Sequence, residues 1–97
     1  MATFVMLANF TEQGIRNVKD TVKRAEAFKE TAKAAGVTVK EVYWTLGQYD
    51  VIVTAEAKDE TAVTALGLTL AKAGNVSTQT LRAFGPGEMA EILGKVK

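Results

Sequence analysis

Residues 37–57 read VTVKEVYWTLGQYDVIVTAEA, two runs rich in valine, threonine and aromatic residues with a glycine at position 47 between them. Side chains of these kinds favour extended strands, and glycine supplies the positive φ that tight hairpin turns need. The segment therefore predicts a β-hairpin with strands over residues 37–46 and 49–57, joined by a two-residue type II′ turn at Gly47-Gln48. The second strand is apolar on both faces at its centre, as is typical of a strand covered on both sides.

The sequence before the hairpin predicts a strand followed by a helical region. Residues 3–10 form a short run that is apolar on both faces, which again indicates a central strand. Thr11 is a suitable N-cap for one helical turn over residues 11–16, and Asn17 with Asp20 resembles a capping box for a longer helix over residues 17–35. Its apolar residues recur every three or four positions, and Gly36 ends it. The basic residues of this helix are expected on its solvated face: Lys19, Lys23, Arg24, Lys29 and Lys33.

The sequence after the hairpin predicts a helix, a strand and a final helix. Asp59 caps a helix over residues 60–73, which Gly74-Asn75 stops, and residues 76–84 form the fourth strand. Gly85-Pro86-Gly87 breaks the chain before a C-terminal helix, because proline suits the first turn of a helix. One face of that helix carries the apolar residues Met89, Ile92, Leu93 and Val96.

The order strand, helix, strand, strand, helix, strand is that of the ferredoxin-like, split βαβ arrangement. The prediction is an α+β fold, one domain over residues 1–97, with a four-stranded antiparallel sheet and an added C-terminal helix. In this arrangement the first and third strands are central, which agrees with their two apolar faces.

Composition excludes several classes of function. The chain has 97 residues, 12 basic and 11 acidic, and neither cysteine nor histidine. It therefore lacks disulfides, thiolate nucleophiles and the commonest general base and metal ligand, and we expect no cofactor. The balanced charge gives no basis for binding nucleic acid, and no stretch is apolar enough to span a membrane. A cytoplasmic location is the expectation.

The predicted layering also implies association. Two helices cover one face of the sheet, so the apolar side chains on the other face need another cover. Leaving each of them exposed to water would lose about 1.5–3 kcal/mol of burial free energy. A second copy stacked sheet against sheet would provide that cover. Residues 61–71 add a second indication, because this helical segment carries no charge and contains Gly67, which allows close approach by a neighbour. The alternative is a surface helix with no partner.

Several segments resemble the GYD domain family, named for a Gly-x-Tyr-Asp turn that is Gly47-Gln48-Tyr49-Asp50 here. The likeness covers essentially the whole chain, including residues 11–15, 41–45, 73–76 and 81–84. It implies a ferredoxin-like fold of the dimeric α/β-barrel kind and no known activity, since the family is largely uncharacterised. Members tend to carry proline where this chain has Val22, which leaves open whether the first long helix is broken there.

Five residues are candidates for binding a ligand: Trp44, Tyr49, Asp50, Thr80 and Arg82. Asp50 is either a general base at a pocket mouth or an acceptor of backbone N–H groups, and Tyr49 either joins it or packs across the hairpin. Trp44 walls a ligand cavity or packs in the core or an interface. If Leu81 and Ala83 face the helices, Thr80 and Arg82 face the open side, where the guanidinium binds an anion or pairs with an acidic residue such as Asp50 or Glu56.

Three functions follow as hypotheses. The first is a non-catalytic homo-oligomer that binds a small metabolite at an intersubunit or sheet-face pocket. The second is a cofactor-free enzyme of the oxygenase or isomerase type, against which the absence of histidine and cysteine weighs. The third is a structural unit that assembles through its uncharged helix. The sequence does not decide whether the chain is an enzyme, although a non-catalytic function is favoured.

Overall fold

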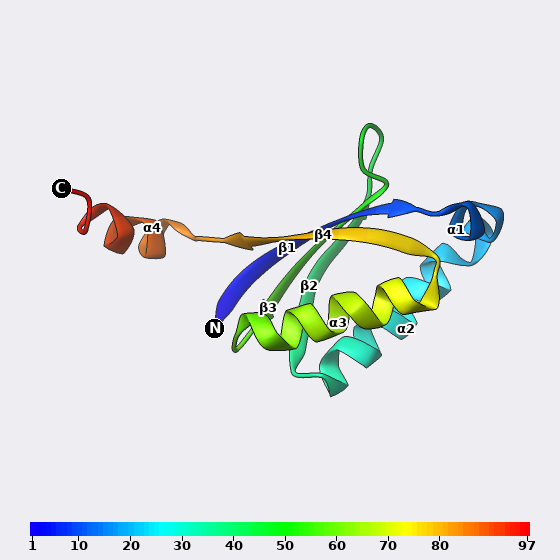
Figure 1. The fold of residues 1–97 in the computed structure, drawn as a ribbon, viewed down its shortest axis with the longest axis horizontal. Coiled ribbons are helices and arrows are strands. Elements are labelled where there is room, and N and C mark those ends of the chain that lie inside the picture. Colours follow the sequence, from blue (N-terminus) through cyan, green and yellow to red (C-terminus); the bar gives the residue numbers. More distant parts are fainter.

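A four-stranded antiparallel sheet in the order β2-β3-β1-β4 forms the body of the molecule. The computed structural model describes all 97 residues, and Figure 1 labels the elements. Their bounds are β1 (Ala2–Phe10), α1 (Glu12–Arg16), the 3-10 turn η1 (Val18–Asp20), α2 (Thr21–Ala34), β2 (Val37–Trp44), β3 (Val51–Ala57), α3 (Glu60–Ala73), β4 (Val76–Ala83) and α4 (Pro86–Leu93). The predicted element order, the antiparallel sheet and its central strands β1 and β3 are confirmed.

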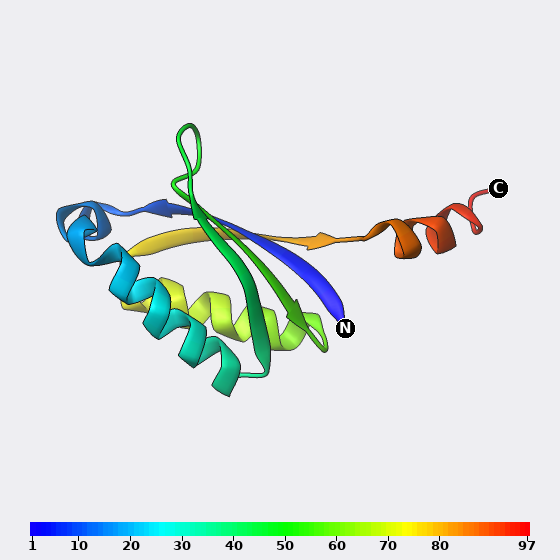
Figure 2. The ribbon, with the colours of Figure 1, turned by 180° about the vertical axis from the view of Figure 1, so that it is seen from behind.

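The two long helices lie on the same face of this sheet (Figures 1 and 2). Along β1, Phe4, Met6 and Ala8 are buried beneath them, whereas the alternate residues Val5 and Leu7 are only partly buried on the other face. This two-residue alternation follows from the pleat of a strand, which sends successive side chains to opposite faces. The molecule therefore has one helix-covered face and one open face.

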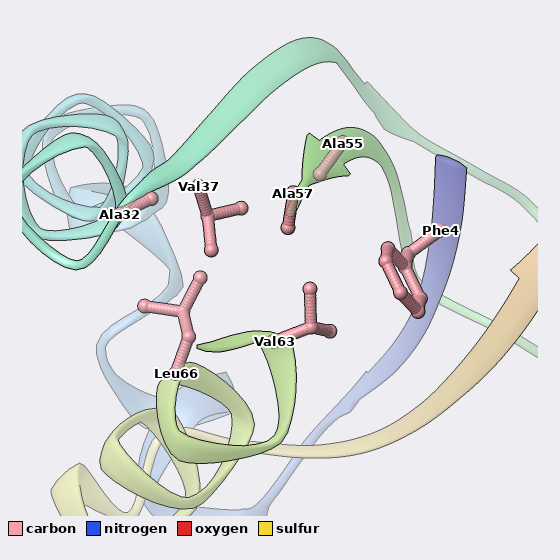
Figure 3. Close-up of a cluster of buried hydrophobic side chains, with 7 residues drawn as sticks. All are labelled: Phe4, Ala32, Val37, Ala55, Ala57, Val63 and Leu66. Carbon is pink, nitrogen blue, oxygen red and sulfur yellow. The ribbon is translucent and has the colours of Figure 1, made fainter. Parts of the chain in front are cut away.

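The closed part of the core lies under the end of α2 and the start of α3 (Figure 3). Alanines on both layers let the helices approach the sheet closely there, and larger side chains fill what remains. The cluster consists of Phe4, Ala32, Val37, Ala55, Ala57, Val63 and Leu66.

The helical region after β1 differs from the prediction at its capping residues. Thr11 caps α1 as expected, with its Oγ1 accepting from the Gly14 N–H at 3.1 Å. Asn17 does not cap the longer helix, because its side chain donates to the Gln13 carbonyl at 3.0 Å and so closes α1 instead. A 3-10 turn follows, and α2 begins at Thr21. Val22 lies in the first turn of α2, where proline is tolerated because the N–H has no helical partner, and the helix runs through this position unbroken.

The hairpin connection is longer than predicted. Strand β2 ends at Trp44 and β3 begins at Val51, so the two-residue turn is wrong. The loop is closed by Thr45, whose N–H donates to the Asp50 carbonyl at 2.8 Å and whose hydroxyl donates to the Tyr49 carbonyl at 2.6 Å. Gly47 does take a positive φ of 123°, but within a six-residue connection, residues 45–50, that stands out from the sheet (Figure 1).

The C-terminal helix leaves the body altogether (Figures 1 and 2). The molecule measures 50 × 31 × 19 Å because β4 continues into α4 beyond the edge of the helix layer. The predicted apolar face of α4 is exposed, at 43% for Met89, 37% for Ile92 and 58% for Leu93. None of the helices in the chain has the length and apolarity needed to cross a lipid bilayer.

Candidate ligand-binding site

An apolar pocket of about 270 Å³ lies between α2, α3 and the helix-covered face of the sheet. It occupies the opposite end of the helix layer from the closed core, near the start of α2 and the end of α3. Thirteen of its 18 lining residues are hydrophobic. Its walls are Thr21, Arg24, Ala25, Ala27, Phe28 and Thr31 of α2, Leu66, Thr69, Leu70 and Ala73 of α3, and Ala8, Phe10, Val42, Trp44, Val51, Val53, Asn75 and Val76 of the sheet and its ends.

Small side chains of both helices line the pocket at this end. Ala25 and Ala27 of α2 and Ala73 of α3 leave space that no larger neighbour fills. Protein interiors are normally packed without voids of this size, and an apolar cavity of about 150 Å³ is already enough to bind benzene. The pocket is thus large enough for a small organic molecule.

Trp44, one of the five predicted site residues, forms part of this wall. Its side chain lies on the helix face of β2 and its Nε1 donates to the Thr21 hydroxyl at 3.0 Å, which ties the end of β2 to the start of α2. The indole is 42% exposed, so it stands at the pocket mouth rather than in the closed core. Tyr43 faces the open side, where its hydroxyl donates to Glu41 at 2.7 Å, and this hydrogen bond raises the pKa of Tyr43.

Tyr49 and Asp50 lie outside the pocket and organise the strand ends. Asp50 accepts the Phe10 N–H at 2.9 Å through its side chain, and its own N–H donates to the Ala8 carbonyl at 2.9 Å. The Tyr49 hydroxyl donates to the Gln79 side chain at 3.0 Å, which links the hairpin loop to β4. The Asp50 contact corresponds to the alternative in which its carboxylate accepts a backbone N–H group, whereas the Tyr49 hydroxyl reaches β4.

Arg82 and Thr80 lie on the helix-covered face, so the predicted orientation of β4 is wrong. The register sets Arg82 opposite Phe4 and Thr80 opposite Met6, while Leu81 pairs with Val5 on the open face. The β1–β4 pairing decides this, and the mixed sequence of β4 does not reveal it. Arg82 binds neither Asp50 nor Glu56.

The partner of Arg82 is Glu88, at 2.7 Å, and its guanidinium lies 4.5 Å from the centre of the Phe84 ring. It also donates to the carbonyls of Thr3 and Ala83. With these contacts made, Arg82 anchors the start of α4 and has little capacity left for a ligand. Thr80 is exposed and lies outside the pocket.

Sequence reasoning missed Arg24. It was assigned to the solvated face of the long helix, yet it lines the pocket and its Nη2 atom is buried without a hydrogen-bond partner. The available signal was its position one turn before Phe28, since residues four apart share a helix face. No group of three or more acidic residues, the only such ligand types in this chain, is placed to hold a metal ion.

An antiparallel sheet under two helices, with a pocket between the layers, defines an α+β protein of the ferredoxin-like class. The chain belongs to the GYD domain family, whose model matches residues 4–93. The fold is similar to a solved structure described as the crystal structure of FFRP-DM1, with a TM-score of 0.57 and 24% sequence identity over 87% of this chain and 100% of that one. No curated protein matches the sequence.

Proposed function

We propose that this GYD-domain chain is a homo-oligomeric module that binds a small, mainly apolar molecule in the pocket between its helices and its sheet. The observation that carries the proposal is the pocket itself, about 270 Å³ with largely hydrophobic walls and an indole at its mouth. Binding sites for small molecules are typically concave, mostly apolar and formed before the ligand arrives. The pocket lies on the helix-covered face, away from Tyr49 and Asp50.

The open face of the sheet supports the homo-oligomer. Its centre carries Val5, Leu7, Ile52 and Leu81, which are cross-strand neighbours in the register of β1 with β3 and β4. Polar groups flank them, including the Glu41–Thr54 hydrogen bond of 3.2 Å. An apolar centre within a polar rim is the usual anatomy of a protein interface.

Two sheets stacked through this face would form the dimeric α/β-barrel association expected of the family. The ligand pocket would remain accessible in such a dimer, because it lies on the other side of each sheet. The bare apolar face of α4 is a second surface that association would cover.

Filling the pocket tests the proposed binding. Trp44 is the single tryptophan of the chain and lies at the mouth, so its fluorescence reports occupancy by a neutral apolar probe such as 1-naphthylamine. We expect Ala25→Leu to weaken probe binding by about ten-fold or more while leaving the melting temperature unchanged or raised, since cavity filling commonly stabilises a protein.

The matched control is Ala34→Leu, which adds the same side chain to an exposed position of the same helix. It should bind the probe like the wild type. Equal binding by wild type and Ala25→Leu, or no binding by the wild type, would contradict the proposal.

A further inference from the structure

Each polar residue of the pocket except Arg24 makes at least one side-chain hydrogen bond within the chain. Thr21 accepts from Trp44, Thr31 and Thr69 donate to carbonyls of their own helices, and Asn75 accepts from Gln13. Arg24 is the exception, because its buried Nη2 has no partner. Arg24 is therefore the pocket residue that combines a full positive charge with a buried donor lacking a hydrogen bond.

No acidic residue of the chain neutralises this guanidinium. The four ion pairs join Arg16 to Glu12, Lys29 to Glu26, Lys40 to Glu56 and Arg82 to Glu88, and Arg24 is in none of them. Asp20, four residues before Arg24 in the chain, also makes no ion pair with it. A buried guanidinium N–H without a partner is unfavourable, and an anion bound beside Arg24 would remove that cost.

The chemistry of arginine narrows the kind of anion. Its planar guanidinium presents paired N–H donors that match the two oxygens of a carboxylate, and such charge-assisted hydrogen bonds are stronger than neutral ones. A polyol or sugar would bring several hydroxyls into a wall of aromatic and aliphatic side chains and leave them unpaired, which is costly.

We infer that the ligand is an amphipathic monocarboxylate whose carboxylate binds Arg24 and whose apolar tail or ring fills the space between Phe28, Trp44 and Leu70. The pocket volume lies between that of a cavity that binds benzene and that of a pocket for drug-sized molecules. It therefore suits a molecule of about ten to fifteen non-hydrogen atoms. This inference rests on the proposed function, because it names the chemical class of ligand for the same pocket.

A pair of probes that differ only in the head group tests it. Binding of decanoate and 1-decanol to the full chain is measured at neutral pH by calorimetry and by Trp44 fluorescence, below the concentrations at which either ligand aggregates. The wild type should bind decanoate about ten- to a hundred-fold more tightly than decanol, the range expected for a hydrogen bond to a charged group.

Variants of Arg24 assign this preference to the guanidinium. Arg24→Gln should lower the decanoate affinity to that of decanol without changing decanol binding. Arg24→Lys keeps the positive charge but not the paired N–H donors, so it should retain part of the preference for decanoate. Lys23→Gln removes a charge from the neighbouring, exposed position and should leave both affinities unchanged. Thermal melts of each variant verify that it is folded.

The outcomes separate this inference from the proposed function. Equal affinity of the wild type for both probes, or a decanoate preference that survives Arg24→Gln, overturns the carboxylate site while the apolar pocket stands. Binding of neither probe by the wild type overturns the pocket as well.

Discussion

Gly14 and Gly67 both lie in helices, yet the structure gives them opposite roles. A Cβ added to Gly14 would lie 1.9 Å from the Asn75 carbonyl oxygen, which accepts the Thr11 N–H. A Cβ added to Gly67 would meet nothing nearer than the Thr78 hydroxyl, at 4.0 Å. Within the chain, close backbone approach therefore requires glycine at Gly14, where α1 touches the start of β4, and not at Gly67.

Alanine substitutions should separate these two roles. We expect Gly14→Ala to lower the free energy of unfolding by about 2–3 kcal/mol, because the backbone must move to remove the overlap. Gly67→Ala should raise it by about 0.5–1 kcal/mol, through better helix propensity alone. Urea unfolding at one protein concentration checks both values, and a stable Gly14→Ala protein or a destabilised Gly67→Ala protein would contradict the packing described here.

Asp50 gives a second prediction at this scale, because its carboxylate holds the last N–H of β1. Asp50→Ala should cost about 1–3 kcal/mol by leaving the half-buried Phe10 N–H unpaired. Asp50→Asn keeps one acceptor oxygen and should cost less. Chemical denaturation measures both, and binding of the apolar probe should stay within about two-fold of wild type, since Asp50 does not line the pocket. Loss of probe binding in a stable Asp50→Asn protein would instead indicate a role at the ligand site.

At the level of helices and strands, the sequence predicted the elements that have a periodic pattern. It did not predict the loop length and the strand orientation, which depend on contacts with other elements. Strand and helix periodicity placed α3 at Glu60–Ala73 with its Asp59 cap, because local hydrogen bonding determines both. The hairpin loop was placed too short because the bond between Thr45 and Asp50 replaces a two-residue turn. The orientation of β4 depends on its register with β1, which no pattern within residues 76–84 encodes.

The pocket illustrates the same limit. For Trp44 the sequence left a cavity wall and core or interface packing as alternatives. Arg24 was assigned to solvent, because the alternation of basic and apolar residues in α2 does not show how far α3 lies from it. Small residues such as Ala25 and Ala73 are compatible with tight packing or with a void, and only the placement of both helices distinguishes the two.

The connection from β4 to α4 provides a pH-dependent prediction. The Arg82 side chain lowers the pKa of Glu88, mainly by its hydrogen bond and further by its charge. A lowered pKa in the folded state means that the stabilising contact is complete at neutral pH and is lost as the pH falls through that pKa. We therefore expect α4 to be held by Arg82 at pH 7 and released in the acid range, below the ordinary pKa of a glutamate.

Backbone NMR relaxation of residues 86–93 between pH 7 and pH 3 measures this release. Glu88→Gln should leave the helix mobile relative to the body across the whole range, whereas Glu91→Gln, an exposed residue of the same helix without an ion pair, should titrate like the wild type. A helix whose mobility does not change with pH in the wild type would show that other contacts hold it.

In the whole molecule, the two faces of the sheet differ in what covers them. One face is closed by α2 and α3 and contains the pocket, and the other presents Val5, Leu7, Ile52 and Leu81 with no element of the same chain above them (Figure 2). Burying side chains of this size contributes about 1.5–3 kcal/mol each when the burial is complete. A second copy on this face is the association that we propose.

Sedimentation equilibrium of the wild type, Ile52→Lys and Val22→Lys tests this claim most directly. Ile52 lies at the centre of the open face, whereas Val22 is 59% exposed on α2 and outside the pocket, so the two variants introduce the same charge at an interface and at a control site. We expect the wild type and Val22→Lys to sediment as a multiple of the 10.4 kDa chain and Ile52→Lys to sediment as a folded monomer. A wild type that remains at 10.4 kDa, or an Ile52→Lys protein that associates as the wild type does, would contradict it.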